Sequence, residues 1–409
     1  MLKQVVIKGF RSCDSVEITG IQGILALVGR NGAGKTNILR AIEWAARVAT
    51  STESLSPEET RASGHPREIS LVVELGEQQF MYSVSLLFSH AKATVKDHVS
   101  AVSMTVTEAV DLRSTATDPW ARFVTRENES ITFAGSEPAV RTGAAASCMP
   151  ALASVLPADH PVNLQLAPLR IFLRAIRYYP LDEASNVPFG ESAIVSPETY
   201  AQWLTLFKTA SDPGESVIRR ILYMWLEQRD KFTELASLLG ADGLGLIDAI
   251  QVRPFEGPPR KSNQETPDAN ARVFYFVNFN PTGVPARAGN FDYGELSLGT
   301  RRVIRILVSM IFDGSSVLLM EQPEDAIHSG LKKKLTDLLK TNSNPLQFIL
   351  ASHSSDVFNR LEPAEIRLVA ITNGRTVLRA LTPKEIEAAK RFMEKEGALS
   401  DFLETVEES

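Results

Sequence analysis

Two patterns of hydrophobic residues take turns along the chain: short continuous apolar runs, and apolar residues at helical spacing. Together they predict an α/β fold. Continuous apolar runs of strand length, "GILALVG", "SVLLME" and "QFILAS", are typical of strands that are buried on both faces. After the first run, Ile38, Leu39, Ile42 and Ala46 repeat at helical spacing, and a helix with leucines on one face follows the second run. Strands that alternate with helices predict a largely parallel sheet covered by helices.

The remaining segments show other patterns. From about residue 66 to 135, short apolar runs separated by turns predict an antiparallel β lobe, and from about 150 to 250 the spacing becomes helical. The polar, proline-containing stretch 255–272 is interpreted as a mobile loop, and Asn373-Gly374 predicts the turn of a hairpin. We therefore expect three parts: an N-terminal half of an α/β body at 1–145, a helical insertion with the mobile loop at 146–270, and the C-terminal half at 271–409.

Composition narrows the class of protein. Of the 409 residues, 22% are charged and 44% hydrophobic, which is ordinary for a globular protein. The net charge of −6 gives no overall attraction to nucleic acid, so such contacts would need a local basic patch. Two cysteines, Cys13 and Cys148, make neither a disulfide framework nor a metal-ligand spacing, which favours a reducing cytoplasm. We find neither a signal-peptide core nor a membrane-spanning stretch, and we expect a cytoplasmic protein with no membrane partner.

The most informative motif lies between the first strand and its helix. "GRNGAGKT" is a complete G-x-x-x-x-G-K-[ST] sequence, and we call Gly29–Thr36 the phosphate loop. Glycines let backbone N–H groups turn inward around a phosphate chain, and the helix N-terminus adds partial positive charge. A lysine here reaches the β- and γ-phosphates, and the threonine hydroxyl ligates Mg²⁺. The motif predicts binding of ATP or GTP with Mg²⁺ by Asn31, Gly32, Ala33, Gly34, Lys35 and Thr36.

Three further motifs follow in the last third of the chain. "LSLGT", with Ser297 and Gly299, precedes a helix and suits either an anion-binding helix N-terminus or an ordinary helix N-cap. The strand "SVLLME" ends in the acid Glu321, and the strand "QFILAS" delivers His353 at its carboxyl end. Open α/β sheets place their ligands at that end, which favours a functional histidine over a structural one.

In this order, the four motifs resemble an ABC-type ATPase head of the SMC/RecF/OLD group. The opening "IKGFRSCDSVEI", "GKTN" and "EQPEDAIH" are also similar to patterns of that group, and the resemblance covers about residues 1–90 and 270–380. It implies a two-lobed α/β head with a P-loop sheet, an antiparallel β lobe and here a helical insertion in place of a coiled coil. Neither sustained heptads nor repeats are visible, as expected for a compact head.

The resemblance also implies roles for individual residues. Such heads form head-to-tail homodimers with two ATP molecules in the interface, so Ser297 and Gly299 of one subunit would face the γ-phosphate held by Lys35 of the other. His353 would be the switch histidine that contacts this phosphate. Asn37 follows the loop in "GKTN" and is taken as nucleotide-binding, and Arg11 and Ser12 would lie near the nucleotide. The family's Q-loop glutamine cannot be placed.

The strand ending in Glu321 departs from the family pattern. Glu321 can hold the Mg²⁺ shell, but the next residue is Gln322 where the family has the acid that activates water. An amide accepts no proton, and a positioned general base contributes about 10²–10⁴-fold. Three explanations stay open: an engineered Glu→Gln trap, a natural subfamily of low turnover, or a base role for Glu324 on the following turn.

The resulting functional hypothesis is an ATPase that couples its nucleotide state to DNA or to a partner effector. Stand-alone heads of this kind resemble the ATPase components of two-gene phage-defence systems. Only some fifty residues follow His353, too few for the TOPRIM nuclease domain of OLD proteins, so a nuclease would be a separate chain. DNA contact is expected mainly in the ATP-bound dimer. The alternatives are a RecF-like DNA repair ATPase and an ATP-gated scaffold with negligible hydrolysis.

Overall fold

The computed structural model describes most of the chain. The described residues are 1–52, 67–90, 102–134, 140–141, 147–180, 193–208, 216–257, 273–285 and 290–407. They form two compact units, of which the first consists of Met1–Tyr179, Ser315–Gln322 and Thr336–Ser409, and the second of Pro180–Gly314 and Pro323–Leu335. The predicted mobile loop falls largely outside the described residues, and the predicted three-part division stays a prediction.

A six-stranded sheet forms one half of the first unit. Its order is β10-β14-β15-β3-β16-β17, and all neighbours are parallel except the last pair. The sheet is built from far-separated segments: β3 (Ile24–Val28), β10 (Ile176–Tyr179), β14 (Val317–Glu321), β15 (Gln347–Ser352), β16 (Ile366–Thr372) and β17 (Arg375–Ala380). Every residue of β3 and β15 is buried, which confirms strands covered on both faces.

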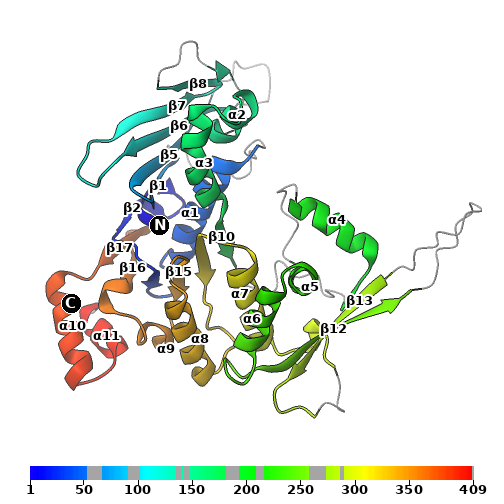
Figure 1. Ribbon diagram of the computed structural model, residues 1–409. Helices are drawn as coiled ribbons and strands as arrows, with labels where there is room; N and C mark the ends of the chain where they lie inside the picture. The colour runs from blue at the N-terminus through cyan, green and yellow to red at the C-terminus, as the bar shows by residue number, and fades with distance from the viewer. Residues whose placement is uncertain are drawn as a thin grey trace, which may run out of the picture. The chain divides into compact units, whose positions relative to one another are not determined.

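An eight-stranded antiparallel sheet forms the other half of the first unit (Figure 1). Its order is β2-β1-β4-β5-β6-β7-β8-β9. The strands are β1 (Leu2–Phe10), β2 (Cys13–Thr19), β4 (Arg67–Leu75), β5 (Gln78–His90), β6 (Val102–Arg113), β7 (Ala121–Glu127), β8 (Ser130–Phe133) and β9 (Val140–Arg141). The predicted antiparallel β lobe is therefore confirmed, and β1 and β2 extend it beyond the predicted segment.

Helix α1 (Lys35–Thr50) connects the two sheets. It packs on β1 and β4 of the antiparallel sheet and on β10, β14 and β15 of the mixed sheet. Its apolar residues Ile38, Leu39 and Ile42 are fully buried in one continuous core. The helices α2 (Cys148–Val155) and α3 (Pro161–Arg174) cover α1 further. The helix that begins at the phosphate loop is thus held by most of the unit's core.

The carboxyl end of the first unit carries short helices beside the β16–β17 hairpin. They are α9 (Ser355–Phe358), α10 (Pro383–Lys395) and α11 (Leu399–Glu407), with the 3₁₀ turn η2 (Pro363–Glu365). Asn373 and Gly374 both have positive φ, 52° and 76°, as the predicted two-residue turn requires.

The second unit combines helices with a small sheet. Its elements are α4 (Pro197–Lys208), α5 (Val217–Glu227), α6 (Arg229–Leu239), η1 (Tyr293–Glu295), α7 (Leu298–Phe312) and the sheet β11-β13-β12, formed by Ile194–Val195, Val273–Pro281 and Ile247–Glu256. An aromatic cluster that includes Trp203, Phe207, Tyr223 and Phe312 joins α4, α5 and α7. Helix α8 (Ser329–Thr341) begins in this unit and ends in the first.

The expected fold class, α/β with a P-loop sheet, an antiparallel β lobe and a helical part, is confirmed. Across the described residues, no helix has the length and apolar character needed to cross a membrane.

Candidate functional site

The glycines of the phosphate loop are required by close contacts with the β16–β17 hairpin. A Cβ at Gly29 would lie 2.0 Å from the Val369 carbonyl oxygen, and one at Gly34 would lie 1.9 Å from Thr376 Oγ1. Gly34 also has a φ of 97°, which L side chains rarely adopt. The loop can therefore approach this hairpin only without side chains at these two positions.

Lys35 is held by the loop that precedes it. Its Nζ donates to the backbone oxygens of Gly29 at 2.6 Å and Arg30 at 3.0 Å, and the side chain is only 7% exposed. These bonds keep the ammonium group over the start of α1, where the helix N-terminus also contributes positive potential. A cation and a row of backbone N–H groups at one place are what a phosphate chain needs.

A cavity of about 380 Å³ brings together the phosphate loop and the carboxyl ends of β14 and β15, which lie far from the loop in the sequence. We call it the phosphate cavity. It is lined by Asn31, Gly32, Ala33, Gly34, Lys35, Thr36, Asn37, Glu321, Gln322 and Ala351. The parallel pairing of β14, β15 and β3 puts their carboxyl ends at one edge of the sheet, beside the loop.

Glu321 and Thr36 suit a magnesium ion. Glu321 Oε1 is buried and makes no hydrogen bond of normal geometry in the described part of the chain, so a cation would satisfy it. Tyr178 of β10 lies nearby, and its pKa is raised, first by burial and then by the Glu321 carboxylate. Mg²⁺ is commonly held by one or two protein oxygens with phosphates and water, so these two residues are a sufficient protein contribution.

Gln322 is positioned by its backbone and by His353. Its N–H donates to the Ala351 oxygen at 2.8 Å, and its φ of 43° places it in the left-handed region. The amide Nε2 lies 3.2 Å from His353 Nδ1. A residue other than glycine in this conformation costs roughly 1–2 kcal/mol, and such strain tends to occur at functional sites. The structure thus brings these two sequence-predicted residues together, and Gln322 also lines the phosphate cavity.

Arg11, Ser12 and Asn37 form a connected group beside the loop. Arg11 NH1 donates to Asn37 Oδ1 at 3.3 Å, and Asn37 Nδ2 donates to Ser12 Oγ at 2.8 Å. Ser12 Oγ lies 2.7 Å from Thr376 Oγ1, which donates to the Ala33 oxygen at 3.1 Å. Sequence reasoning missed Thr376, because a threonine two residues after a hairpin turn carries no local signal of this contact.

Ser297, Gly299 and Glu324 belong to the second unit. Ser297 is the N-cap of α7, because its Oγ accepts from Thr300 N at 3.1 Å. A Cβ at Gly299 would lie 2.3 Å from the Ala326 oxygen, so this glycine allows α7 to pack on the turn that contains Glu324. Glu324 is only 2% exposed.

Two of the arginines after "LSLGT", Arg302 and Arg305, do not face solvent. Arg302 and Arg305 are buried on α7, and Arg302 NH1 lies 4.0 Å from an Asp325 carboxylate oxygen. Burial favours the internal ion pair over a DNA-binding surface at this helix.

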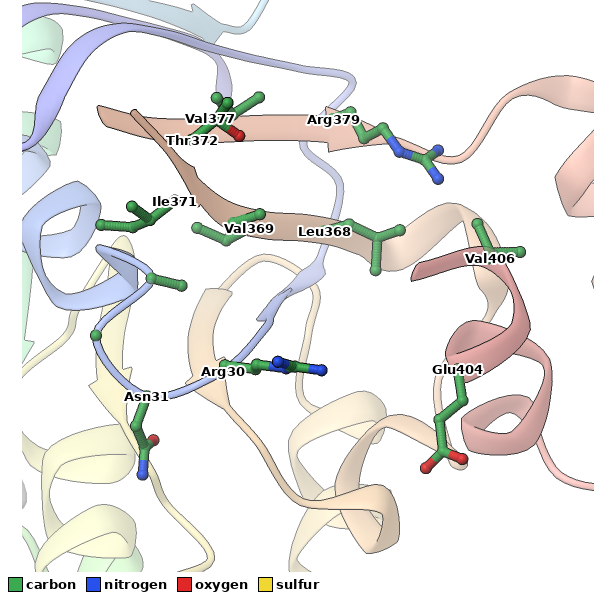
Figure 2. A pocket seen from close by; sticks show the side chains of 13 residues that line it. Arg30, Asn31, Leu368, Val369, Ile371, Thr372, Val377, Arg379, Glu404 and Val406 are labelled. Atoms are coloured by element: carbon green, nitrogen blue, oxygen red, sulfur yellow. The ribbon is translucent and has the colours of Figure 1, made fainter. Parts of the chain in front are cut away.

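A second, larger cavity of about 950 Å³ lies on another side of the phosphate loop (Figure 2). We call it the hairpin cavity. Its walls come from the loop (Arg30, Asn31, Gly32 and Ala33), from the hairpin (Leu368, Val369, Ala370, Ile371, Thr372, Val377 and Arg379) and from α11 (Glu404 and Val406). The two cavities share Asn31, Gly32 and Ala33, so one stretch of loop separates them.

Comparisons with known proteins add a fold likeness and a family. Solved structures similar to this chain include the SMC head domain from Thermotoga maritima, with 15% identity, 93% of this chain and 99% of that chain covered, and a TM-score of 0.43. Another is the Smc head domain bound to the C-terminal domain of ScpA, derived from Pyrococcus furiosus, with 13% identity, 96% and 99% covered, and a TM-score of 0.45.

Comparison with curated proteins gives no match. The sequence family described as "AAA domain, putative AbiEii toxin, Type IV TA system" matches residues 24–80 and 205–359, which include most of the motifs described above. Since these two segments make up more than half of the sequence, the chain belongs to this family of AAA-domain ATPases.

Proposed function

We propose that this protein is an ATP-dependent switch that binds MgATP in the phosphate cavity and hydrolyses it slowly. The observation that carries the proposal is the single cavity lined by both Lys35 and Glu321. Lys35 and the loop N–H groups would bind the β- and γ-phosphates, while Thr36 and Glu321 would hold the metal. When bound, Mg²⁺ would neutralise charge that develops on the phosphates.

We expect slow ATP hydrolysis because Gln322, and not a carboxylate, would lie beside the γ-phosphate. Gln322 can orient a water molecule through its amide but cannot take the water's proton. His353 Nδ1 accepts from Gln322 Nε2, which leaves the N–H at the other ring nitrogen, Nε2, to donate to a phosphate oxygen. These residues favour ATP binding and water positioning over rapid proton transfer.

The output of the switch is proposed to be a head-to-tail homodimer. Ser297 and Gly299 would complete the phosphate site of the other subunit, as in the ABC-type heads that the motifs resemble. Support comes from α7, whose N-cap residue Ser297 is exposed on the second unit. The dimer would then contact DNA or a separate effector such as a nuclease, in a setting of phage defence. The family description, "putative AbiEii toxin, Type IV TA system", is compatible with action beside a second protein.

Light scattering with and without MgATP, combined with a nucleotide-binding titration, tests this proposal. We expect a monomer without nucleotide, a dimer with MgATP, and little phosphate released over the time of the measurement. Lys35→Ala should abolish both binding and dimerisation, while Lys8→Ala, which removes an exposed lysine paired with Glu68, serves as a matched control. Retained ATP binding in Lys35→Ala would overturn the assignment of the phosphate cavity.

A further inference from the structure

We propose that Thr376 is a positioning residue for the phosphate loop, which holds the Ala33–Gly34 peptide in the orientation needed to bind phosphate. The inference rests on the proposed nucleotide binding and extends it to the carboxyl-terminal hairpin. Thr376 lies on β17, more than three hundred residues from the loop in sequence, and is only 2% exposed. Its Oγ1 donates to the Ala33 oxygen at 3.1 Å, and its backbone N–H donates to the Ser12 oxygen at 2.8 Å.

The proton positions along this group follow from the chemistry of its members. Thr376 Oγ1 has one proton, and the Ala33 carbonyl can only accept, so that proton is used there. Ser12 Oγ, 2.7 Å away, must therefore donate to Thr376. Ser12 in turn accepts from Asn37 Nδ2. Arg11 donates to the Asn37 oxygen, so every bond points from a guanidinium toward the loop carbonyl.

A chain of bonds that all point one way strengthens each member, because every donor is polarised by the donor behind it. Here the chain begins at a permanent positive charge and ends at a single backbone oxygen of the loop. The Ala33 carbonyl is therefore held more firmly than one neutral hydrogen bond alone would hold it.

Because the peptide is planar, the bond to the Ala33 oxygen also fixes the direction of the Gly34 N–H. In a trans peptide the C=O and the following N–H point in opposite directions within one plane. Fixing the Ala33 oxygen toward Thr376 therefore directs the Gly34 N–H away from the hairpin. Ala33 and Gly34 also line the phosphate cavity, so this N–H is a donor for the phosphate chain. Rotation of the same peptide would remove that donor without displacing any side chain.

The packing leaves little freedom for another arrangement. A Cβ at Gly34 would come within 1.9 Å of Thr376 Oγ1 and 3.0 Å of Ser12 Oγ, so the two hydroxyls lie directly against the loop backbone. The residue after Thr376 on β17, Val377, lines the hairpin cavity together with Arg30 and Ala33. One strand thus contacts the loop through Thr376 and a separate surface through Val377.

The test compares the ATP affinity of three variants by calorimetric titration with Mg²⁺ present. Thr376→Val keeps the shape and removes the hydroxyl, Thr376→Ser restores the hydroxyl, and Thr50→Val makes the same change at the far end of α1, where Thr50 Oγ1 bonds to the Ala46 oxygen. We expect Thr376→Val to weaken ATP binding by about threefold to tenfold, which corresponds to one hydrogen bond. Thr376→Ser should recover most of the affinity, and Thr50→Val should match the wild type.

A thermodynamic cycle with Ser12→Ala provides a second readout. If Ser12 acts through Thr376, the double variant should bind ATP nearly as well as Thr376→Val alone, because the chain is already broken. Additive losses would show that Ser12 acts on the nucleotide independently of Thr376, and would overturn the directed chain. Titrations are made well below the unfolding temperature of each variant, so that a loss of stability does not appear as a loss of affinity.

The outcomes also separate this inference from the proposed function. If the wild-type protein binds ATP but Thr376→Val binds it equally well, the positioning role is wrong and the switch is unaffected. If Thr376→Ser is as weak as Thr376→Val, the lost contact is packing and not the hydroxyl bond, which again overturns the inference. If the wild type itself binds no nucleotide, the proposed function fails first and the inference fails with it.

Discussion

The side-chain amide of Gln322 lies 3.2 Å from Nδ1 of His353, at the carboxyl ends of two neighbouring parallel strands. An amide nitrogen donates and does not accept, so His353 Nδ1 is the acceptor and its ring proton is on Nε2. A glutamate at position 322 would change this pair completely, because a carboxylate accepts and would require a proton on Nδ1. The orientation of the Gln322 amide and the tautomer of the histidine are therefore linked.

The first prediction concerns this pair. Gln322→Glu should raise the rate of phosphate release by about 10²–10⁴-fold, because it supplies the missing general base, while the affinity for ATP should change little. Steady-state phosphate release from the two proteins, measured side by side, gives the result. Lys35→Ala in the Gln322→Glu background should remove the gained activity.

Equal turnover in both proteins would show that residue 322 does not act in the chemical step. Glu324→Gln would then be the next variant, since Glu324 is the alternative base. If neither protein turns over, addition of DNA or of a partner distinguishes a missing activator from a scaffold.

The second prediction concerns dimerisation. Ser297→Arg should block the ATP-induced dimer by placing a long charged side chain at the exposed start of α7, and ATP binding by the monomer should be unchanged. The variant also loses the bond to Thr300 N, which costs about 1 kcal/mol of helix stability. Ser297→Ala loses the same bond without adding bulk and is the control.

Light scattering in MgATP should therefore show a monomer for Ser297→Arg and at least a partly retained dimer for Ser297→Ala. A normal dimer in Ser297→Arg would contradict the head-to-tail arrangement.

The third prediction concerns a buried carboxylate in the antiparallel sheet. Glu108 on β6 is fully buried, accepts from Cys148 N at 2.6 Å and from Tyr82 and Ser147 hydroxyls at 3.2 Å, and faces Arg126 at 3.6 Å. Glu108→Gln removes the carboxylate charge that faces the buried Arg126, so we expect a loss of about 3–5 kcal/mol in unfolding free energy.

Urea unfolding followed by circular dichroism measures this loss. Glu68→Gln, which breaks an exposed pair with Lys8, should cost less than about 1 kcal/mol. If both variants lost less than about 1 kcal/mol, the buried contacts of Glu108 would not contribute substantially to stability.

The fourth prediction concerns the two thiols. Burial raises the pKa of Cys13 to about 11, and burial with the nearby Glu108 carboxylate raises the pKa of Cys148. Since only the thiolate reacts, both cysteines should resist a disulfide reagent at pH 8 in the native protein and react rapidly in 6 M guanidinium. Rapid native reaction of either thiol would contradict its burial.

The same shift has a consequence for stability. The pKa of Cys13 is raised in the folded state above its usual value of 9.0, so the protonated thiol's contribution is complete below about pH 9 and is lost as pH rises toward 11. Unfolding free energy should fall across this window, and less steeply in Cys13→Ala. An equal fall in both proteins would assign the loss to other groups.

The strands that are buried on both faces could be predicted because their residues are continuously apolar, and the phosphate loop because its chemistry restricts every position. β10 was missed, since its four residues "IRYY" include a charged arginine and its pairing with β14 depends on a segment far away in sequence. β13 carried a usable signal in its aromatic run "VFYFVNF", but the sequence analysis predicted no strand there and only included the segment in the C-terminal half at 271–409.

Within the candidate site, the sequence identifies residue types but not their directions. Glu321 and Lys35 could be matched because each ends or begins a regular element. The left-handed backbone at Gln322 and the bond from Thr376 to Ala33 depend on tertiary contacts, and neither has a local pattern. Ser297 could be assigned as an N-cap from sequence, whereas the close approach of Gly299 to Ala326 required the fold.

The strand order of the six-stranded sheet determines when each strand can find its neighbours during synthesis. A ribosome that has made the phosphate loop still has to make more than three hundred residues before Thr376 emerges. At roughly 5–20 residues per second this interval is about 20 to 70 seconds. For most of that time β3 has neither of its neighbours, β15 and β16, and its fully apolar sequence has no partner within the sheet. The nascent amino-terminal half is therefore a natural client for chaperones, and completion of the nucleotide site is one of the last events of synthesis.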